Sequence, residues 1–124
     1  MSHRIVIRAA DVTAEGVLND TTTATAVWDA LPLTGKANTW GDEIYFAIPV
    51  KEEIEPTAQE IVEKGDLGYW PAGRAFCIFF GPTPASTGNE IRPASAVNII
   101  GRVEGDPTVF KQVEDGARIQ IDPA

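Results

Sequence analysis

The chain has 124 residues, with ten lysines and arginines against 18 aspartates and glutamates, a formal net charge of −8 and 44% hydrophobic residues. This length fits one hydrophobic core, so we expect residues 1–124 to form a single domain. Binding to a phosphate backbone depends on clustered lysine and arginine, so the acidic balance argues against nucleic acid as a partner. No apolar window approaches the ~20 residues of a membrane-spanning helix, which argues against a membrane partner.

The amino-terminal segment lacks the pattern of a secretory signal. The opening MSHRIVIRAAD alternates apolar and polar residues and has no continuous apolar stretch with small residues at a cleavage site. The single cysteine, Cys77, stands among apolar residues and indicates a buried, inert thiol. We therefore expect a cytoplasmic protein.

The chain opens with the pattern of a β-hairpin. In residues 4–9, Ile5 and Ile7 alternate with positions that would face solvent, which is typical of a strand with one buried face. Residues 12–18 follow after a turn near Asp11 and are interpreted as the antiparallel partner.

The next segment has the period of an amphipathic helix. Asp20 or Thr21 can cap its first amides, and Pro32 would end it. Trp28 lies on the apolar stripe and is expected to be a core residue. The stripe has its members at i, i+3, i+4 and i+7, namely Ala24, Val27, Trp28 and Leu31.

A second hairpin is predicted around a turn at residues 41–42. Trp40 would end its first strand, and apolar residues alternate along the second strand, within residues 44–48. Glu43 and Tyr45 share the opposite face of that second strand, because side chains alternate along a strand.

Residues 57–73 predict a ragged strand, a turn at 64–66 and a short stretch that ends at Tyr69 and Trp70. A strand at residues 74–80 follows, and its run AFCIFF is apolar on both faces. In an antiparallel barrel one strand face fills the interior, so the other face needs a cover. We expect a helix to provide it.

The last third of the chain begins with a loop. Residues 81–93 hold a glycine or proline at short intervals, and loops of this length in a compact domain are often functional. Residues 95–105 are interpreted as a strand. Residues 107–114 predict a short helix, with Asp106 as N-cap and a proline at the first position, and residues 117–121 a final strand.

These elements amount to about eight short strands and two short helices, which predicts a mainly β fold, a closed antiparallel barrel. Residues 65–86, GDLGYWPAGRAFCIFFGPTPAS, and 90–105, EIRPASAVNIIGRVEG, resemble a small prokaryotic family of uncharacterised cyclophilin-like proteins. Residues 18–49, LNDTTTATAVWDALPLTGKANTWGDEIYFAIP, are also similar to that family. The resemblance implies a cyclophilin-like fold, an antiparallel β-barrel with two capping helices.

The residues that true cyclophilins use for prolyl isomerisation are not recognisable here. Those enzymes supply an arginine, a row of aromatic residues, and a histidine and a tryptophan late in the chain, whereas the single histidine here is His3 and no tryptophan follows Trp70. No motif carries their arginine over to a position of this sequence. Arg92 is the best candidate for a ligand contact, because a loop guanidinium can bind a carboxylate or an amide oxygen. The alternative is an ion pair with Glu90.

Aromatic residues at or near strand ends form the main candidate site, because tyrosine and tryptophan can bury a ring and leave a polar tip for a ligand. Glu43 could enter the same pocket with a raised pKa and act as an acid or a base. The predicted ligand-binding residues, with Arg92 from the loop, are Trp40, Glu43, Tyr45, Tyr69, Trp70, Phe80 and Arg92.

The sequence predicts neither a metal nor a cofactor. One histidine and one cysteine, without acidic residues at ligand spacing, leave no tetrahedral ligand set. The glycines of GDLGYWPAG lack the lysine and the following helix of a phosphate-binding loop.

Three functions remain open from the sequence. The leading hypothesis is a non-catalytic module whose aromatic pocket binds a small molecule or an extended peptide. The second is an enzyme, either a divergent peptidyl-prolyl isomerase or an acid–base catalyst that uses Glu43. The third is a structural subunit whose aromatic residues near Tyr69 and Trp70 form an interface.

Overall fold

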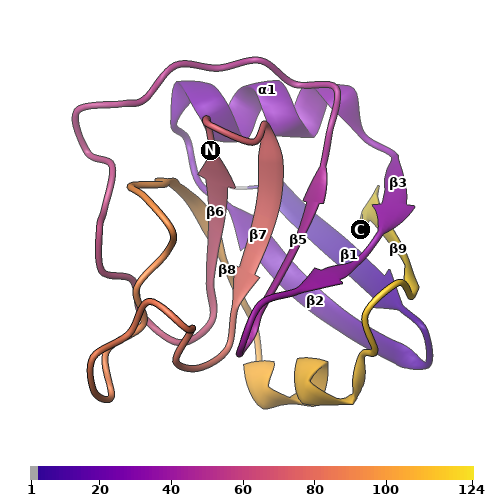
Figure 1. The fold of residues 1–124 in the computed structure, drawn as a ribbon. Helices are drawn as coiled ribbons and strands as arrows, with labels where there is room; N and C mark the ends of the chain where they lie inside the picture. Colours follow the sequence, from indigo (N-terminus) through magenta and orange to yellow (C-terminus); the bar gives the residue numbers. More distant parts are fainter. Residues whose placement is uncertain (1–2) are drawn as a thin grey trace.

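The computed structural model describes residues 3–124, and in this range nine antiparallel strands form one sheet that curls into a nearly closed barrel (Figure 1). The strand order is β3-β9-β1-β2-β8-β6-β7-β5-β4. In chain order the elements are β1 (His3–Ala9), β2 (Val12–Leu18), α1 (Thr22–Ala30), β3 (Leu33–Lys36), β4 (Asn38–Thr39), β5 (Glu43–Ala47), β6 (Asp66–Trp70), β7 (Ala75–Phe79), β8 (Asn98–Val103), the 3₁₀ helix η1 (Pro107–Gln112) and β9 (Arg118–Pro123). The mainly β fold expected from the sequence is confirmed.

The barrel closes through a continuous piece of chain. Strands β3 and β4 stand at opposite ends of the strand order, yet they are consecutive in the chain and only Ala37 separates them. β3 pairs with β9 and β4 pairs with β5. Between them, the amide of Ala37 donates to the carbonyl of Ala117 at 2.7 Å, and the amide of Gly116 donates to the carbonyl of Ala37 at 2.7 Å. The segment 33–39 therefore joins the two edges of the sheet.

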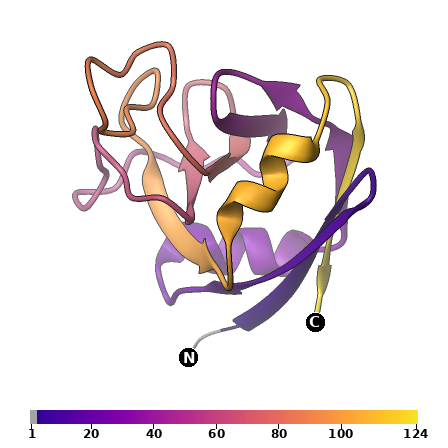
Figure 2. The same cartoon turned by 90° about the horizontal axis from the view of Figure 1, so that it is seen from below.

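The core fills the barrel, and the two helices lie at its opposite ends (Figures 1 and 2). Alternation puts Ile5 and Ile7 of β1 inside, as expected. The rings of Phe46 and Phe76 meet at a centroid distance of 5.8 Å, and Phe110 of η1 contributes a fully buried ring. Most of the stabilisation of such a barrel comes from this buried apolar area.

Helix α1 begins and ends as the sequence indicates. The Thr21 hydroxyl accepts a hydrogen bond from the amide of Ala24 at 3.1 Å, so Thr21 is the N-cap. Trp28 packs against the core but is only half-buried, and its ring stacks on His3 at a centroid distance of 4.2 Å. Among residues 3–124, neither α1 nor η1 is long enough to span a membrane, and no other helix is present in this range.

The cover of β7 differs from the expectation. Its outward side chains Ala75, Cys77 and Phe79 pack against Val62, Ile91 and Val97, which belong to the connecting segments before β6 and before β8. These two segments pair with each other through isolated bridges at Gln59↔Val97 and Val62↔Ile91. A helix is therefore not needed, because apolar side chains from two paired connections already remove this face from water. The ragged strand expected at the start of residues 57–73 is not a regular strand. Residues 57–65 form part of this irregular cover, and the first regular strand of the segment is β6.

The carboxy-terminal helix is shorter than predicted. Residues 107–114 were expected to form a helix, and the structure has a 3₁₀ helix at Pro107–Gln112. Its N-cap is Asp106, as expected, and the carboxylate accepts from the amide of Thr108 at 3.0 Å. The amide of Val113 then donates to the carbonyl of Phe110 and the helix ends.

Asn98, at the start of β8, fixes the crossing segment between β5 and β6. Its side-chain amide donates to the hydroxyl of Thr23 at 3.0 Å and to the carbonyl of Glu53 at 2.9 Å, and its oxygen accepts from the amide of Glu55 at 2.8 Å. The side chain is completely buried. This asparagine therefore satisfies backbone groups of Glu53 and Glu55 in the crossing segment.

We expect Asn98→Ala to lower the free energy of unfolding by about 2 kcal/mol, because the substitution leaves buried donors and acceptors without partners. Urea denaturation monitored by tryptophan fluorescence measures this. Asn89→Ala, at an exposed loop position, is the matched control and should change the free energy by less than about 0.5 kcal/mol. Equal effects of the two substitutions would contradict the role of Asn98.

Candidate functional site

A pocket lies on the outer side of the barrel wall, between the strands β5 and β6 and the connection that leads to β8. Its volume is about 210 Å³ and its walls are mostly apolar. Wider hollows of about 360–590 Å³ elsewhere on the surface are more open to solvent. The residues that line the pocket are Trp40, Glu43, Tyr45, Trp70, Pro93, Ala94 and Val97.

The turn that carries Trp40 and Glu43 is held by the loop after β7. The amide of Trp40 donates to the carbonyl of Glu43 at 2.9 Å and closes the turn. Asp42 between them donates from its amide to the carbonyl of Pro82, and its own carbonyl accepts from the amide of Phe80, both at 2.9 Å. Gly41 has a φ of +60°, which favours glycine, and a Cβ there would lie within 3.0 Å of the loop backbone.

Trp70 forms the facing wall at the end of β6. Its indole Nε1 donates to the hydroxyl of Ser95 at 2.6 Å, which ties β6 to the connection before β8. Its ring meets the ring of Tyr45 edge-on, with a centroid distance of 6.4 Å and an interplanar angle of 79°. A Cβ at Gly73 would lie 2.6 Å from the indole, so this close approach requires glycine. Both contacts hold the ring in place.

Glu43 provides a buried carboxyl group in the pocket. Only 5% of the residue is exposed. Burial raises the pKa of Glu43 to about 7, and its polar interaction with the neighbouring Cys77 thiol opposes this rise. The pKa of Cys77 is itself well above its usual range, because the thiol is fully buried and lies beside Glu43. Cys77 is therefore protonated and unreactive, as the sequence indicates.

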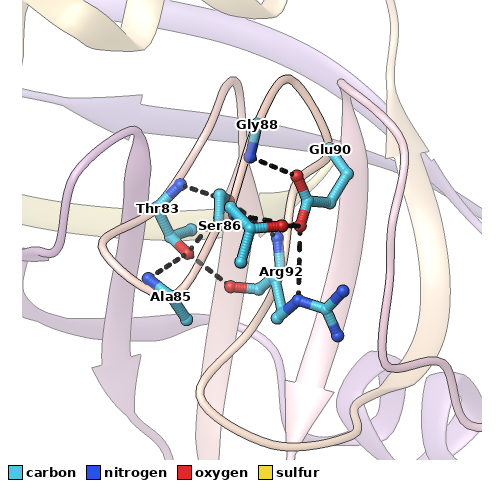
Figure 3. A network of polar contacts seen from close by, with 7 residues as sticks. Thr83, Ala85, Ser86, Gly88, Glu90 and Arg92 are labelled. Carbon is cyan, nitrogen blue, oxygen red and sulfur yellow. Dashed lines mark hydrogen bonds and ion pairs between the residues drawn. The ribbon is translucent and has the colours of Figure 1, made fainter.

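The loop after β7 is ordered by its own side chains (Figure 3). Glu90 accepts from the amides of Thr87 and Gly88, at 3.0 and 2.8 Å, and from the Thr87 hydroxyl at 2.9 Å. These hydrogen bonds hold the pKa of Glu90 down at about 2. Nearer the pocket, the hydroxyl of Thr83 donates to the carbonyl of Arg92.

Arg92 lies outside the pocket. Its Nε donates to Glu90 Oε2 at 3.4 Å, which is the ion pair that the sequence offered in place of a ligand contact. The residue that follows it, Pro93, lines the pocket instead. A half-exposed guanidinium that has a carboxylate close by gains little from turning towards an apolar wall.

Tyr69 and Phe80 also lie outside the pocket, within the main core. Tyr69 is completely buried and its hydroxyl donates to the carbonyl of Val50. Phe80 packs against Phe110 of η1 at a centroid distance of 6.2 Å. Because consecutive side chains of a strand point to opposite faces, only one of Tyr69 and Trp70 can face outward. In the structure, Trp70 faces outward and lines the pocket.

The structure thus brings Trp40, Glu43, Tyr45 and Trp70 together, and adds three residues that were not among the predicted site residues. Pro93, Ala94 and Val97 are small or apolar, and nothing in their spacing distinguishes them from other loop or strand residues. Only the pairing of their segment with the rest of the cover brings them to the pocket.

A family model described as cyclophilin-like matches residues 3–122. The chain belongs to the cyclophilin-like family. Among solved structures, the chain is similar to the solution structure of the hypothetical protein AF2241 from Archaeoglobus fulgidus, with 42% identity and a TM-score of 0.84, over 99% of this chain and 95% of that one. No curated protein matches the chain. The resemblance drawn from the sequence is confirmed.

The pocket of this cyclophilin-like protein has no arginine or histidine among the described residues that line it. His3 stacks on Trp28 of α1, and Arg102 pairs with Asp66 at 2.8 Å. Arg74 is an exposed turn residue with a φ of +48°. The wall therefore offers hydrophobic contact and a single carboxyl group.

Replacement of Glu43 should change how stability depends on pH. Between pH 4.5, the ordinary pKa of a glutamate, and pH 7, the folded protein holds a proton that the unfolded chain has released, so the free energy of unfolding falls as the pH rises. Glu43→Gln removes this loss. We expect the stability of the variant relative to the wild type to increase by about 3 kcal/mol across that window and then to level off.

Urea denaturation at a series of pH values up to about pH 8 measures this difference, and the carboxyl ¹³C signal of Glu43 gives its pKa directly. A difference that stays constant with pH, or a carboxyl signal that titrates near 4.5, would contradict the burial of an ionisable group in the pocket.

Replacement of Glu90 should loosen the loop that flanks the site. In Glu90→Ala the amides of Thr87 and Gly88 lose their acceptor, and we expect their hydrogen exchange to accelerate at least tenfold. Amide exchange measured by NMR tests this. Arg92→Ala is the control, since it removes the ion pair but leaves these two hydrogen bonds in place. Acceleration in the control alone would contradict the assignment.

Proposed function

We propose that this cyclophilin-like protein is a non-catalytic binding module, and that the pocket on the outer side of β5 and β6 takes a small molecule or a single side chain of a peptide. The observation that supports it best is that the segment 40–45, with Trp40, Glu43 and Tyr45, meets Trp70 at the end of β6 and so joins three aromatic residues and a buried carboxyl group. Concave, mostly apolar pockets with a few polar groups are typical ligand sites.

The size of the pocket limits the ligand. A cavity of about 150 Å³ in a protein interior holds a benzene molecule. At about 210 Å³, this pocket fits a ring and a few further atoms. An extended peptide would therefore insert only one residue and would lie along the surface with the rest.

An acid–base function would rest on Glu43. A carboxyl group with a pKa of about 7 can both give and take a proton near neutral pH. The other lining side chains are Trp40, Tyr45, Trp70 and apolar residues, which provide neither a second carboxylate nor a cation for a developing charge. Binding is therefore the better-supported function.

A prolyl isomerase and a subunit interface have less support. A divergent prolyl isomerase needs a cation beside the imide, whereas Arg92 lies outside the pocket and pairs with Glu90. A subunit interface at Tyr69 and Trp70 would have only the ring of Trp70 available, because Tyr69 is completely buried.

A fragment screen monitored by ¹H–¹⁵N NMR tests the binding function. Ligands should shift the signals of Trp40, Tyr45 and Trp70, and Trp40→Ala should weaken their binding about tenfold or more, since a tryptophan side chain supplies a large share of the contact area of such a site. Trp28→Ala, at the α1 end of the barrel, removes an indole outside the pocket and should leave the affinity unchanged. Ligands that shift the signals of residues outside the pocket, and whose affinity is unchanged by Trp40→Ala, would overturn the proposal.

A coupled assay on a proline-containing peptide separates binding from isomerisation. We expect no acceleration above the spontaneous rate for the wild type, because the pocket offers no cation to the twisted imide. An acceleration that Arg92→Ala abolishes would instead establish an isomerase.

A further inference from the structure

Glu43 is a buried carboxyl group without a cationic partner among residues 3–124. No lysine or arginine of this range forms an ion pair with it, and Lys111 pairs with the adjacent residue Asp42 at 3.7 Å. Buried carboxylates are normally paired, because an isolated charge loses its hydration without compensation. Ionisation of Glu43 lowers the stability of the folded protein. The presence of this carboxyl group in the pocket therefore indicates a role other than folding.

The other walls of the pocket favour one kind of charge. The faces of the indole and phenol rings carry negative electrostatic potential and attract cations, most strongly in tryptophan. Trp40, Tyr45 and Trp70 present such rings beside Glu43. A carboxylate or phosphate ligand would meet repulsion from Glu43 and would find no lysine or arginine among the described lining residues. A positively charged ligand complements both the rings and the acid.

We propose that the ligand of this pocket is a small organic cation, an ammonium group on a ring-sized apolar frame, with Glu43 as its counter-charge and the rings of Trp40, Tyr45 and Trp70 around it. This inference rests on the proposed binding function and adds the chemical class of the ligand. The frame occupies the apolar wall at Pro93 and Val97.

Binding of such a ligand should be coupled to the release of a proton from Glu43. An ammonium group beside the carboxyl stabilises its ionised form, so binding lowers the pKa of Glu43 and releases a proton when the pH is below about 7. The other titratable groups that face Glu43 are Tyr45 on its own strand and Cys77 on β7, and the raised pKa of the buried Cys77 thiol keeps it neutral in this range. The wall at residues 93–97 has no titratable side chain.

Three probes of one size and different charge test the proposal: benzylammonium, benzyl alcohol and benzoate. Their affinities are measured by ¹H–¹⁵N NMR titration at about pH 8, where Glu43 is ionised and the amine, like a lysine, is still protonated. We expect benzylammonium to bind at least tenfold more tightly than benzyl alcohol, and benzoate to bind most weakly. The affinity for benzylammonium should fall about tenfold or more between pH 8 and about pH 5.5, whereas that for benzyl alcohol should not.

Glu43→Gln keeps the shape of the side chain and removes its charge. In this variant the pH dependence should disappear and the preference for benzylammonium should fall to the smaller part that the aromatic rings supply, while benzyl alcohol still binds. Glu60→Gln removes one charge from an exposed position outside the pocket and should leave the preference intact. This control separates a local effect of Glu43 from the general attraction of an acidic protein for cations.

The two proposals fail in different ways. If benzyl alcohol binds as tightly as benzylammonium and both shift the signals of Trp40 and Trp70, the cation preference is overturned and the binding function stands. If Glu60→Gln reduces the preference as much as Glu43→Gln does, the preference is not a property of the pocket and the proposal is overturned. If none of the three probes shifts the pocket signals at about 10 mM, both proposals are overturned.

Discussion

Strand β7 carries apolar side chains on both faces, so the barrel must fill its interior and also cover part of its outer wall. Phe76 and Ile78 complete the core inside, and Ala75, Cys77 and Phe79 need shelter outside. Burial of apolar area is the main favourable term in folding, and an uncovered outer face of this strand would forfeit part of it. The connections around residues 57–62 and 91–97 provide the shelter. The arrangement of the site follows from this requirement.

The pocket lies where that shelter meets the neighbouring strand. Val97 packs on the outer apolar cluster, whereas Pro93 and Ala94 line the hollow in front of Trp70. Glu43 on β5 faces Phe79 across the ladder and reaches the same outer layer. A carboxyl group so placed loses its hydration, and stability would be greater with a neutral side chain at neutral pH. Unfavourable burial of this kind is typical of functional sites. It identifies Glu43 as a candidate site residue more clearly than its position in the sequence does.

The comparison with the cyclophilin-like family concerns the scaffold. The fold is shared with the hypothetical protein AF2241 of Archaeoglobus fulgidus over nearly the whole chain, but that name assigns no activity. Function depends on the residues that a fold presents at its site. Here the described pocket presents aromatic rings and one acid, and it lacks the arginine and histidine expected of a prolyl isomerase.

The sequence by itself determined most of the elements and the family. Period-two alternation placed the strands, the stripe through Val27 and Trp28 placed α1, and the long similar stretches identified the cyclophilin-like fold, because these signals depend only on neighbours along the chain. Only the tertiary structure decided which aromatic residues meet. Tyr69 and Trp70 are adjacent and both aromatic, yet the register of β6 turns one inward and the other to the pocket. The pairing of Arg92, the loop cover of β7 and the burial of Glu43 likewise depend on contacts between distant segments, which no local pattern encodes.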